Sequence, residues 1–133
     1  MIKIAEMTQE EQISLTQAIM GILDGWGLSA ADAISTLGLP DKTPTRALRK
    51  YRENTPFPLS SEVELRLEHI IGIAEALRTS YPHNPQMGNI WIRQPSKKLN
   101  NRIPLQLIID EGLNGIIELR KHLDCSYDWH ANP

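Results

Sequence analysis

The apolar stretch from Asn100 to Leu123, "NNRIPLQLIIDEGLNGIIELRKHL", constrains the fold more than any other part of the chain. Pro104 stands near its start, and Gly112 and Gly115 interrupt it in the middle. Each glycine inside a helix costs about 1 kcal/mol relative to alanine, so one long core helix would avoid these positions. The stretch therefore predicts two helices, the first opened by Pro104, that turn at Gly112 and form a helical corner.

Aliphatic side chains are expected to meet inside this corner. They are Leu105, Ile108 and Ile109 on the first helix and Leu113, Ile116 and Ile117 on the second. Most are predicted to be ordinary core residues. The other side of the corner would expose helix ends and a loop, a shape better suited to contacting another protein than to enclosing a small ligand.

The first half of the chain carries a series of helix-start signals. Thr8 with Glu11 is a capping-box pattern and predicts a helix over about 9–24. Ser29 opens a shorter helix that ends at Gly38, a residue suited to the left-handed position beyond a helix C-terminus.

Two further helices are expected before the helical corner. Thr43 as N-cap and Pro44 as the first helical residue predict a helix over about 44–52. A second capping-box pattern begins at Ser61 and predicts a longer helix that ends near Ser80. The next segment, "YPHNPQMGN", holds two prolines and a glycine and is expected to interrupt helical structure.

The predicted fold is all-α, with an N-terminal helix-turn-helix bundle in residues 1–80 and a small helical domain in residues 81–133. No alternation of period two indicates a strand. The chain has 133 residues, 41% of them hydrophobic, enough for a modest core. It lacks the pattern of a signal peptide or of a membrane span, so we expect a cytoplasmic protein with no membrane partner.

Neither enzymatic nor metal chemistry is predicted. Cys125 is the only cysteine, which excludes an internal disulfide and gives no zinc-binding pattern. The sequence has no glycine-rich phosphate loop, no His-Glu-x-x-His motif and no nucleophile elbow. His122 is expected in the last turn of the final helix, where a cation complements the helix dipole. We therefore expect no catalytic residues, no bound metal and no cofactor.

Positive charge is concentrated in one short segment, although the net charge of the chain is −2. Residues 38–53 carry five basic and two acidic residues, and the helix over about 44–52 would be the second helix of the helix-turn-helix. The residues expected to contact phosphates or guanine edges are Thr45, Arg46, Arg49, Lys50 and Arg52. The alternative is a solvated face, because both flanking segments are acidic and phosphate affinity grows with the number of neutralised charges.

A recognisable order of residues leads into and through the apolar stretch. It consists of Trp91, Pro95, Leu99, Arg102, Pro104, Leu105, Gly112 and Leu123. This order resembles the toxin-binding domain of the Xre/MbcA/ParS antitoxin family, whose members are encoded beside toxins that carry a RES domain. The upstream helices resemble the family's helix-turn-helix part. Asn100 and Asn101 stand where the family usually has glycine, and asparagine also tolerates a left-handed backbone.

The resemblance implies an antitoxin that neutralises a RES-domain, NAD-consuming toxin by occluding its active site. In the family the C-terminal region approaches the toxin's cleft, and here the segment 124–133 follows the last periodic residue and would be that element. The residues expected to contact the toxin are Trp91, Arg93, Asn101, Arg102, Tyr127, Trp129 and His130. The N-terminal helices would bind operator DNA, making the protein a repressor of its own operon, and a homodimer or a hetero-oligomer with the toxin is expected.

Two other interpretations stay open. The protein could be a free-standing helix-turn-helix transcriptional regulator whose C-terminal helices only dimerise. It could also be an antitoxin that binds its toxin and has lost DNA binding, with the helix-turn-helix kept as a structural element.

Overall fold

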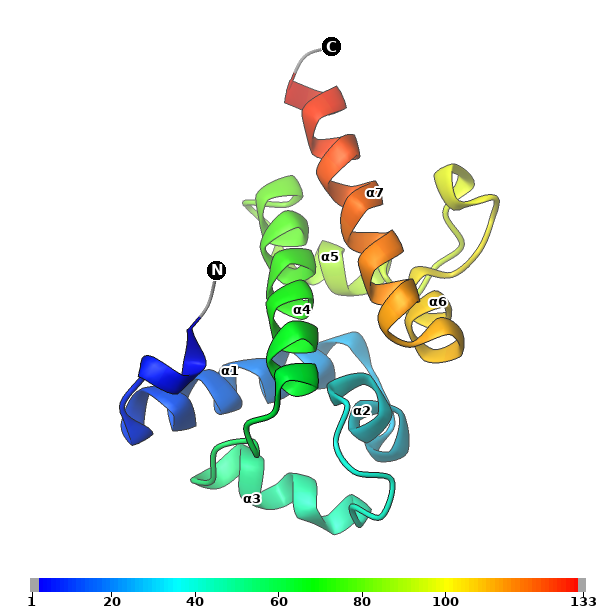
Figure 1. Ribbon diagram of the computed structural model, residues 1–133. Helices are drawn as coiled ribbons and strands as arrows, with labels where there is room; N and C mark the ends of the chain where they lie inside the picture. The colour runs from blue at the N-terminus through cyan, green and yellow to red at the C-terminus, as the bar shows by residue number, and fades with distance from the viewer. Residues whose placement is uncertain (1–2, 132–133) are drawn as a thin grey trace. The chain divides into compact units, whose positions relative to one another are not determined.

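The computed structural model describes the backbone of residues 3–131 and the side chains of residues 3–125. This part of the chain is all-α, as predicted, and contains helices and no strand. The α-helices are α1 (Gln9–Trp26), α2 (Ala30–Leu37), α3 (Leu48–Glu53), α4 (Ser61–Ser80), α5 (Pro85–Trp91), α6 (Pro104–Glu111) and α7 (Leu113–Ala131) (Figure 1). Three short 3-10 helices are η1 (Ile4–Glu6), η2 (Thr45–Ala47) and η3 (Lys97–Leu99).

The chain divides into two compact units, residues 1–68 and residues 69–133. The division lies within α4, the helix whose C-terminal end is at the expected boundary near residue 80. Each unit has buried aliphatic side chains of its own, such as Ile19 and Leu48 in the first and Ile92 and Ile116 in the second.

The caps of α1 and α2 follow the predicted local chemistry. Thr8 and Glu11 exchange hydrogen bonds between side chain and backbone N–H, each 3.1 Å long, which confirms the capping box. The Ser29 hydroxyl accepts a hydrogen bond from the Asp32 backbone N–H at 3.2 Å and caps α2. Gly38 ends α2 with φ 73°, the left-handed conformation that the sequence indicated.

The next two helices begin at other residues than predicted. Pro44 is extended, with φ −72° and ψ 147°, and precedes η2, so it is not the first residue of an α-helix. Helical structure continues from η2 into α3 and ends at Glu53. The cap of α4 is Ser60 and not Ser61, because the Ser60 hydroxyl accepts a hydrogen bond from the Val63 N–H at 3.1 Å.

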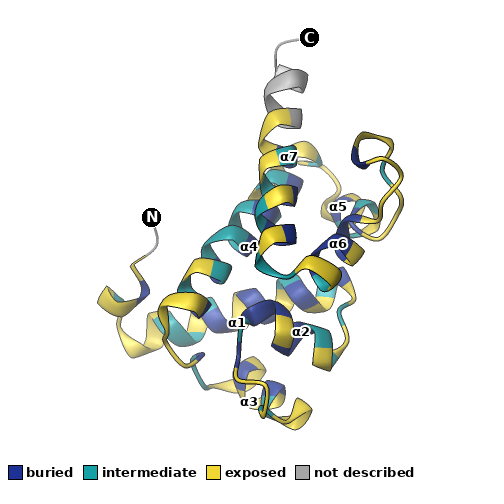
Figure 2. Cartoon of the chain, turned by 45° about the vertical axis from the view of Figure 1, so that its right-hand side comes forward, coloured by how far each residue is buried: buried dark blue, intermediate teal, exposed yellow. Residues whose placement is uncertain are grey.

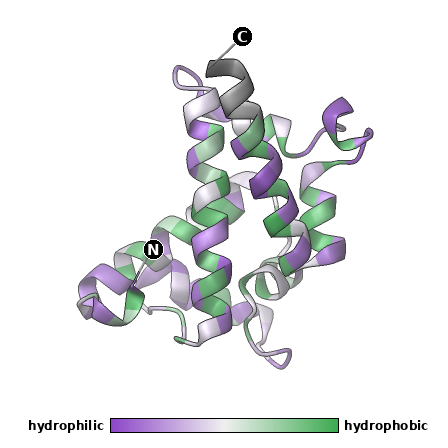
Figure 3. Ribbon diagram, turned by 45° about the horizontal axis from the view of Figure 1, so that its top comes forward, coloured by the Kyte–Doolittle hydropathy of each residue, from purple (hydrophilic) through white to green (hydrophobic). Residues whose placement is uncertain are grey.

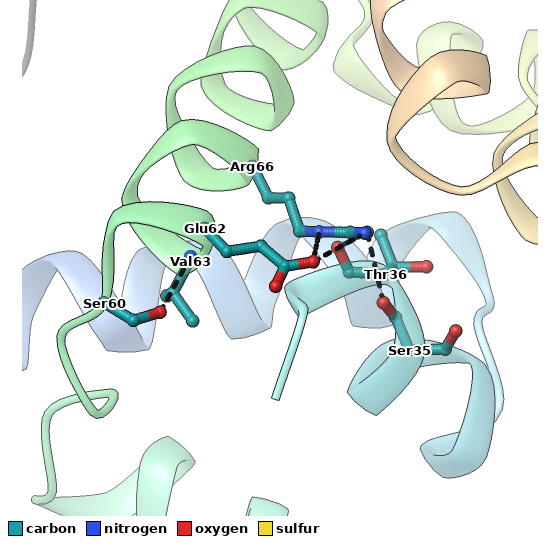
Figure 4. A network of polar contacts seen from close by, with 6 residues as sticks. All are labelled: Ser35, Thr36, Ser60, Glu62, Val63 and Arg66. Atoms are coloured by element: carbon teal, nitrogen blue, oxygen red, sulfur yellow. Dashed lines mark hydrogen bonds and ion pairs between the residues drawn. The ribbon is translucent and has the colours of Figure 1, made fainter. Parts of the chain in front are cut away.

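A long-range contact also requires glycine at position 38. A Cβ atom there would lie 2.7 Å from Cδ of Arg66, so a larger residue would push this side chain away. Arg66 donates hydrogen bonds of 3.3 Å to the carbonyl oxygens of Ser35 and Thr36, the last turn of α2, and bonds Glu62 on its own helix (Figure 4). A cation at a helix C-terminus is favourable because the exposed carbonyls carry partial negative charge.

Two buried threonines give opposite predictions for the same substitution. The Thr16 hydroxyl donates to the Gln12 carbonyl at 2.8 Å and accepts from the Phe57 N–H at 3.1 Å, whereas the Thr36 hydroxyl has no partner in the described part of the chain. We expect Thr16→Val to lower the free energy of unfolding by about 1–3 kcal/mol, because the buried Phe57 N–H loses its acceptor.

The matched variant, Thr36→Val, removes an unsatisfied buried hydroxyl at nearly constant volume and should raise the free energy of unfolding by about 1 kcal/mol. Urea unfolding followed by far-UV circular dichroism measures both. Equal effects of the two substitutions would contradict the difference in hydrogen bonding.

The second unit departs from the prediction at both ends. The segment expected to interrupt helical structure contains α5, in which Pro85 takes the first helical position, where a missing N–H leaves no bond unmade. At the C-terminal end, α7 runs to Ala131, beyond the last periodic residue Leu123. Elsewhere in this unit, the side chain of Arg120 on α7 passes over α4 at Gly72, where the missing Cβ atom leaves room. Its guanidinium group lies 3.1 Å from Nδ1 of His69.

Candidate protein-binding and DNA-binding surfaces

The helical corner of α6 and α7 is closed by two glycines with different roles. Gly112 has φ 59° and ψ −132°, a conformation that side chains disfavour, and it turns the chain between the helices. Gly115 lies inside α7 and is buried because the Leu107 carbonyl of α6 occupies the place of a Cβ atom. The prediction that Gly115 interrupts the helix is therefore wrong, and its role is close packing of α7 against α6.

The core of this corner is close to the predicted one. Leu105, Ile108 and Ile116 are buried as expected. The other three predicted core residues, Ile109, Leu113 and Ile117, are only half-buried. Their places are taken by Leu107 and Leu119, which face the interior of the unit and were not singled out by the sequence.

The loop between α5 and α6 is exposed but held at several points. Asn100 and Asn101 both have left-handed backbones, with φ 58° and 65°, as the asparagine substitution allows. The Ser96 N–H and the Arg102 carbonyl form a hydrogen bond of 3.1 Å, and the Leu105 N–H bonds the Ile92 carbonyl at 2.8 Å. Most of residues 93–102 are exposed, with Leu99 buried beneath them (Figure 2). The loop is therefore anchored at both ends.

Arg102, a predicted toxin contact, has partners within the unit. Arg102 donates to the Leu99 carbonyl at 3.0 Å and to Glu118 on α7 at 2.9 Å, so its side chain fastens the loop to the last helix. Trp91 is half-buried at the end of α5. Arg93 and Asn101 are exposed, and Arg93 has no ion-pair partner among the described residues. The side chains of Tyr127, Trp129 and His130 lie outside the described residues.

Three exposed hydrophobic side chains in this unit were missed by the sequence analysis. Met87 and Ile90 are three residues apart on α5, on one face of the helix, with 41% and 40% of their surface exposed. Ile103 is 36% exposed immediately before α6. The Leu105–Ile92 hydrogen bond joins the two segments that carry them. Recognising α5 as a helix would have shown that Met87 and Ile90 share a face.

Ile103 also borders an open hollow beside α6. The hollow has a volume of about 520 Å³ and is lined by Asn101, Arg102, Ile103, Gln106, Leu107, Asp110 and Glu111. Its walls mix apolar and charged groups and include two of the residues predicted to contact a toxin. We refer to Met87, Ile90 and Ile103 together as the apolar surface of the second unit.

The predicted DNA-binding residues gather on η2 and α3, but most are engaged. Leu48 and Tyr51 of α3 are buried and face inward. Arg49 pairs with Glu53 at 3.1 Å, and the Lys50 ammonium lies 5.3 Å from the Tyr51 ring centroid. Thr45 and Arg46, both on η2, are exposed. Their side chains have no partner in the described part of the chain.

Arg52 is the exception among these residues because its partner is on another helix. It donates two hydrogen bonds, of 2.9 and 2.8 Å, to the carboxylate of Asp24 on α1. This hydrogen bonding lowers the pKa of Asp24 below its usual value. The pair therefore stabilises the fold at neutral pH and loses its contribution as the pH falls through the lowered pKa. Arg52 has a structural role, which the sequence alone did not indicate.

Other kinds of site find no support among the residues that the structure describes. No group of three His, Cys, Asp or Glu side chains is placed to hold a metal ion. No helix there combines the length and the apolar character needed to cross a membrane.

Comparison with known proteins identifies a relative. No protein-family model matches the sequence. Over 108 residues the chain is 31% identical to "Uncharacterized protein y4oB" of Sinorhizobium fredii (strain NBRC 101917 / NGR234). The similarity covers 81% of this chain and 80% of that protein, so it extends over most of both. The chain belongs to the same family as this Sinorhizobium protein.

Proposed function

We propose that the protein is an antitoxin that binds and neutralises a RES-domain, NAD-consuming toxin by occluding its active site. The observation that carries the proposal is the exposure of Ile103 beside the anchored Arg102–Pro104 segment, the part of the chain with the strongest resemblance to toxin-binding domains. An apolar side chain exposed at such a position is a typical anchor for a protein partner.

The packing of the second unit supports this role. Gly115 allows α7 to approach α6 closely, and Arg102 ties the preceding loop to Glu118. A surface held in place before binding loses little conformational entropy when a partner docks. The apolar surface of the second unit is therefore presented by a rigid support, which suits steric occlusion better than a flexible segment would.

Co-expression tests the proposal directly. The proposal expects a neighbouring gene to encode a RES-domain protein, which is then expressed alone and together with this chain while growth, cellular NAD and co-purification are measured. We expect growth arrest and NAD loss with the toxin alone, and recovery of both together with a stable complex when this chain is present. Recovery without a complex, or a complex without recovery, would contradict neutralisation by occlusion.

Autorepression is a second, separable part of the proposal, supported by the exposed and unpaired Arg46. The Arg49–Glu53 pair is solvent-exposed and worth only about 0.5 kcal/mol, so phosphates could displace it. Arg52, in contrast, would have to break a bidentate bond to Asp24. DNA contacts are therefore proposed for Thr45, Arg46, Arg49 and Lys50.

The double variant Arg46→Glu, Lys50→Glu tests DNA contact without disturbing Asp24. At fixed salt, we expect its affinity for the DNA upstream of its own gene to fall by about tenfold or more, because two phosphate contacts become repulsive. Arg78→Glu combined with Lys121→Glu, on exposed residues of α4 and α7, makes the same change in net charge and is the matched control, which should change the affinity much less. If the unsubstituted protein, the double variant and the control bind this DNA equally well, these residues do not recognise DNA, and only the toxin-binding part of the proposal is left.

A further inference from the structure

A second hollow of the unit formed by residues 69–133 has a different character from the one beside α6. Its volume is about 590 Å³, within the range of roughly 300–1,000 Å³ that is usual for small-molecule sites. It is bounded by the C-terminal turn of α4, the end of α5, η3 and the middle of α7. Aromatic and basic side chains, Tyr81, Trp91, Lys97, Lys98 and His122, line it together with smaller residues.

The charged side chains that line this hollow are basic. Lys97 and Lys98 are exposed and have no ion-pair partner among the described residues, and no acidic side chain of that part of the chain lines the hollow. The nearby acids of α7 are used elsewhere, since Glu118 pairs with Arg102 and Asp124 lies 4.0 Å from Arg120. The loop that carries the lysines is hydrophilic (Figure 3).

Two further features bear on the potential in the hollow. Burial and then the charge of Lys98 lower the pKa of His122, while the smaller effect of Glu118 raises it, so the positive charge of Lys98 outweighs that of Glu118 at this imidazole. The C-terminal end of α4 opposes the lysines with only about half an elementary charge, against two full positive charges. The balance therefore favours an anion.

The remaining walls are apolar and aromatic. Tyr81 and Trp91 are half-buried rings, and Leu77 and Leu123 are buried at the base. The indole N–H of Trp91 has no hydrogen-bond partner in the described part of the chain, so it can donate to a ligand. A planar ring next to an anionic group would match both the aromatic walls and the lysines.

We propose that this hollow binds an organic anion of mononucleotide size, with its ring against Trp91 and Tyr81 and its phosphate or carboxylate at Lys97 and Lys98. Aromatic stacking and charge-assisted hydrogen bonds are the interactions by which proteins hold such ligands. The site is separate from the apolar surface of the second unit, and its occupation does not require a toxin.

Adenosine monophosphate is the probe, with adenosine and inorganic phosphate as its separated halves. Each is titrated into the isotope-labelled full-length chain, and amide and indole correlation spectra are recorded, with the Trp91 indole assigned from Trp91→Phe. We expect millimolar adenosine monophosphate to shift the Trp91 indole and the amides of η3, and to leave the buried Trp26 indole unchanged. Adenosine or phosphate alone should bind at least about tenfold more weakly, because each keeps only half of the interactions.

The double variant Lys97→Gln, Lys98→Gln removes both charges and should weaken binding by about tenfold or more. Lys42→Gln combined with Lys121→Gln, on exposed residues that do not line the hollow, removes the same charge and is the matched control, which should have less than a twofold effect. Retained amide spectra show that the variants are folded. The proposal is overturned if the Trp91 indole does not respond to adenosine monophosphate, or if the double variant binds it as well as the control does.

Discussion

Replacing Gly115 by alanine is expected to lower the free energy of unfolding of the second unit by about 2 kcal/mol or more. The new Cβ atom would collide with the Leu107 carbonyl of α6, a backbone group that cannot rotate away. The helices would have to separate, opening the packing around Ile108 and Ile116. Alanine's better helix propensity returns only about 1 kcal/mol, too little to offset this loss.

Gly21→Ala is the matched control because it makes the same change inside a helix with open space around it. No atom lies within 4 Å of the Cβ position at Gly21, so the variant should gain about 0.5–1 kcal/mol. Urea unfolding by circular dichroism gives both values, and hydrogen exchange assigns each change to its unit. Stabilisation by both substitutions would show that α7 does not need the close approach to α6.

The contrast between Gly112 and Gly115 shows where sequence reasoning reaches its limit. Gly112 was predicted to turn the chain and does so with a positive φ. Gly115 was expected only to interrupt the helical stretch, yet it is helical and its φ is not positive. A positive φ is a local property that nearby residues indicate, whereas close approach depends on a helix that folds back from elsewhere.

The same distinction explains the predicted helices. The capping residues Thr8 and Ser29 were identified because a cap bonds a residue three positions away. The helix α5 was missed because the segment 81–89, with two prolines and a glycine, carries helix-breaking signals, and Pro85 is compatible with a helix only in its first turn. Its helical state is favoured by packing, since Gly88 is buried with Leu77 Cβ 3.1 Å from its Cβ position.

Charged residues in the candidate sites were the least predictable. Arg52 and Arg102 were both expected to bind partners, and each forms an ion pair with an acid on another helix. Asp24 and Glu118 lie far from these arginines in the sequence, so no local sequence pattern indicates the two ion pairs. Arg46 and Arg93 are exposed and have no ion-pair partner among the described residues, so they are the better candidates for intermolecular contacts.

The proposed antitoxin function predicts that charges on the apolar surface of the second unit strongly weaken toxin neutralisation. We expect Ile90→Asp combined with Ile103→Asp to weaken binding to the RES-domain protein by about 30-fold or more, because anchor side chains typically contribute at least 2 kcal/mol. Growth rescue and cellular NAD should fall accordingly. Stability should change by less than about 1 kcal/mol, since both side chains are already substantially exposed.

Leu59 and Leu65 of the first unit provide the control, with 44% and 41% of their surface exposed. Leu59→Asp combined with Leu65→Asp adds the same charge at equally exposed positions, so a general effect of charge on solubility or encounter would appear in both double variants. Full rescue by the Leu59/Leu65 variant and none by the Ile90/Ile103 variant would locate the interface on the second unit. The reverse pattern would move it to residues 1–68, and the anchored loop before α6 would then serve folding alone.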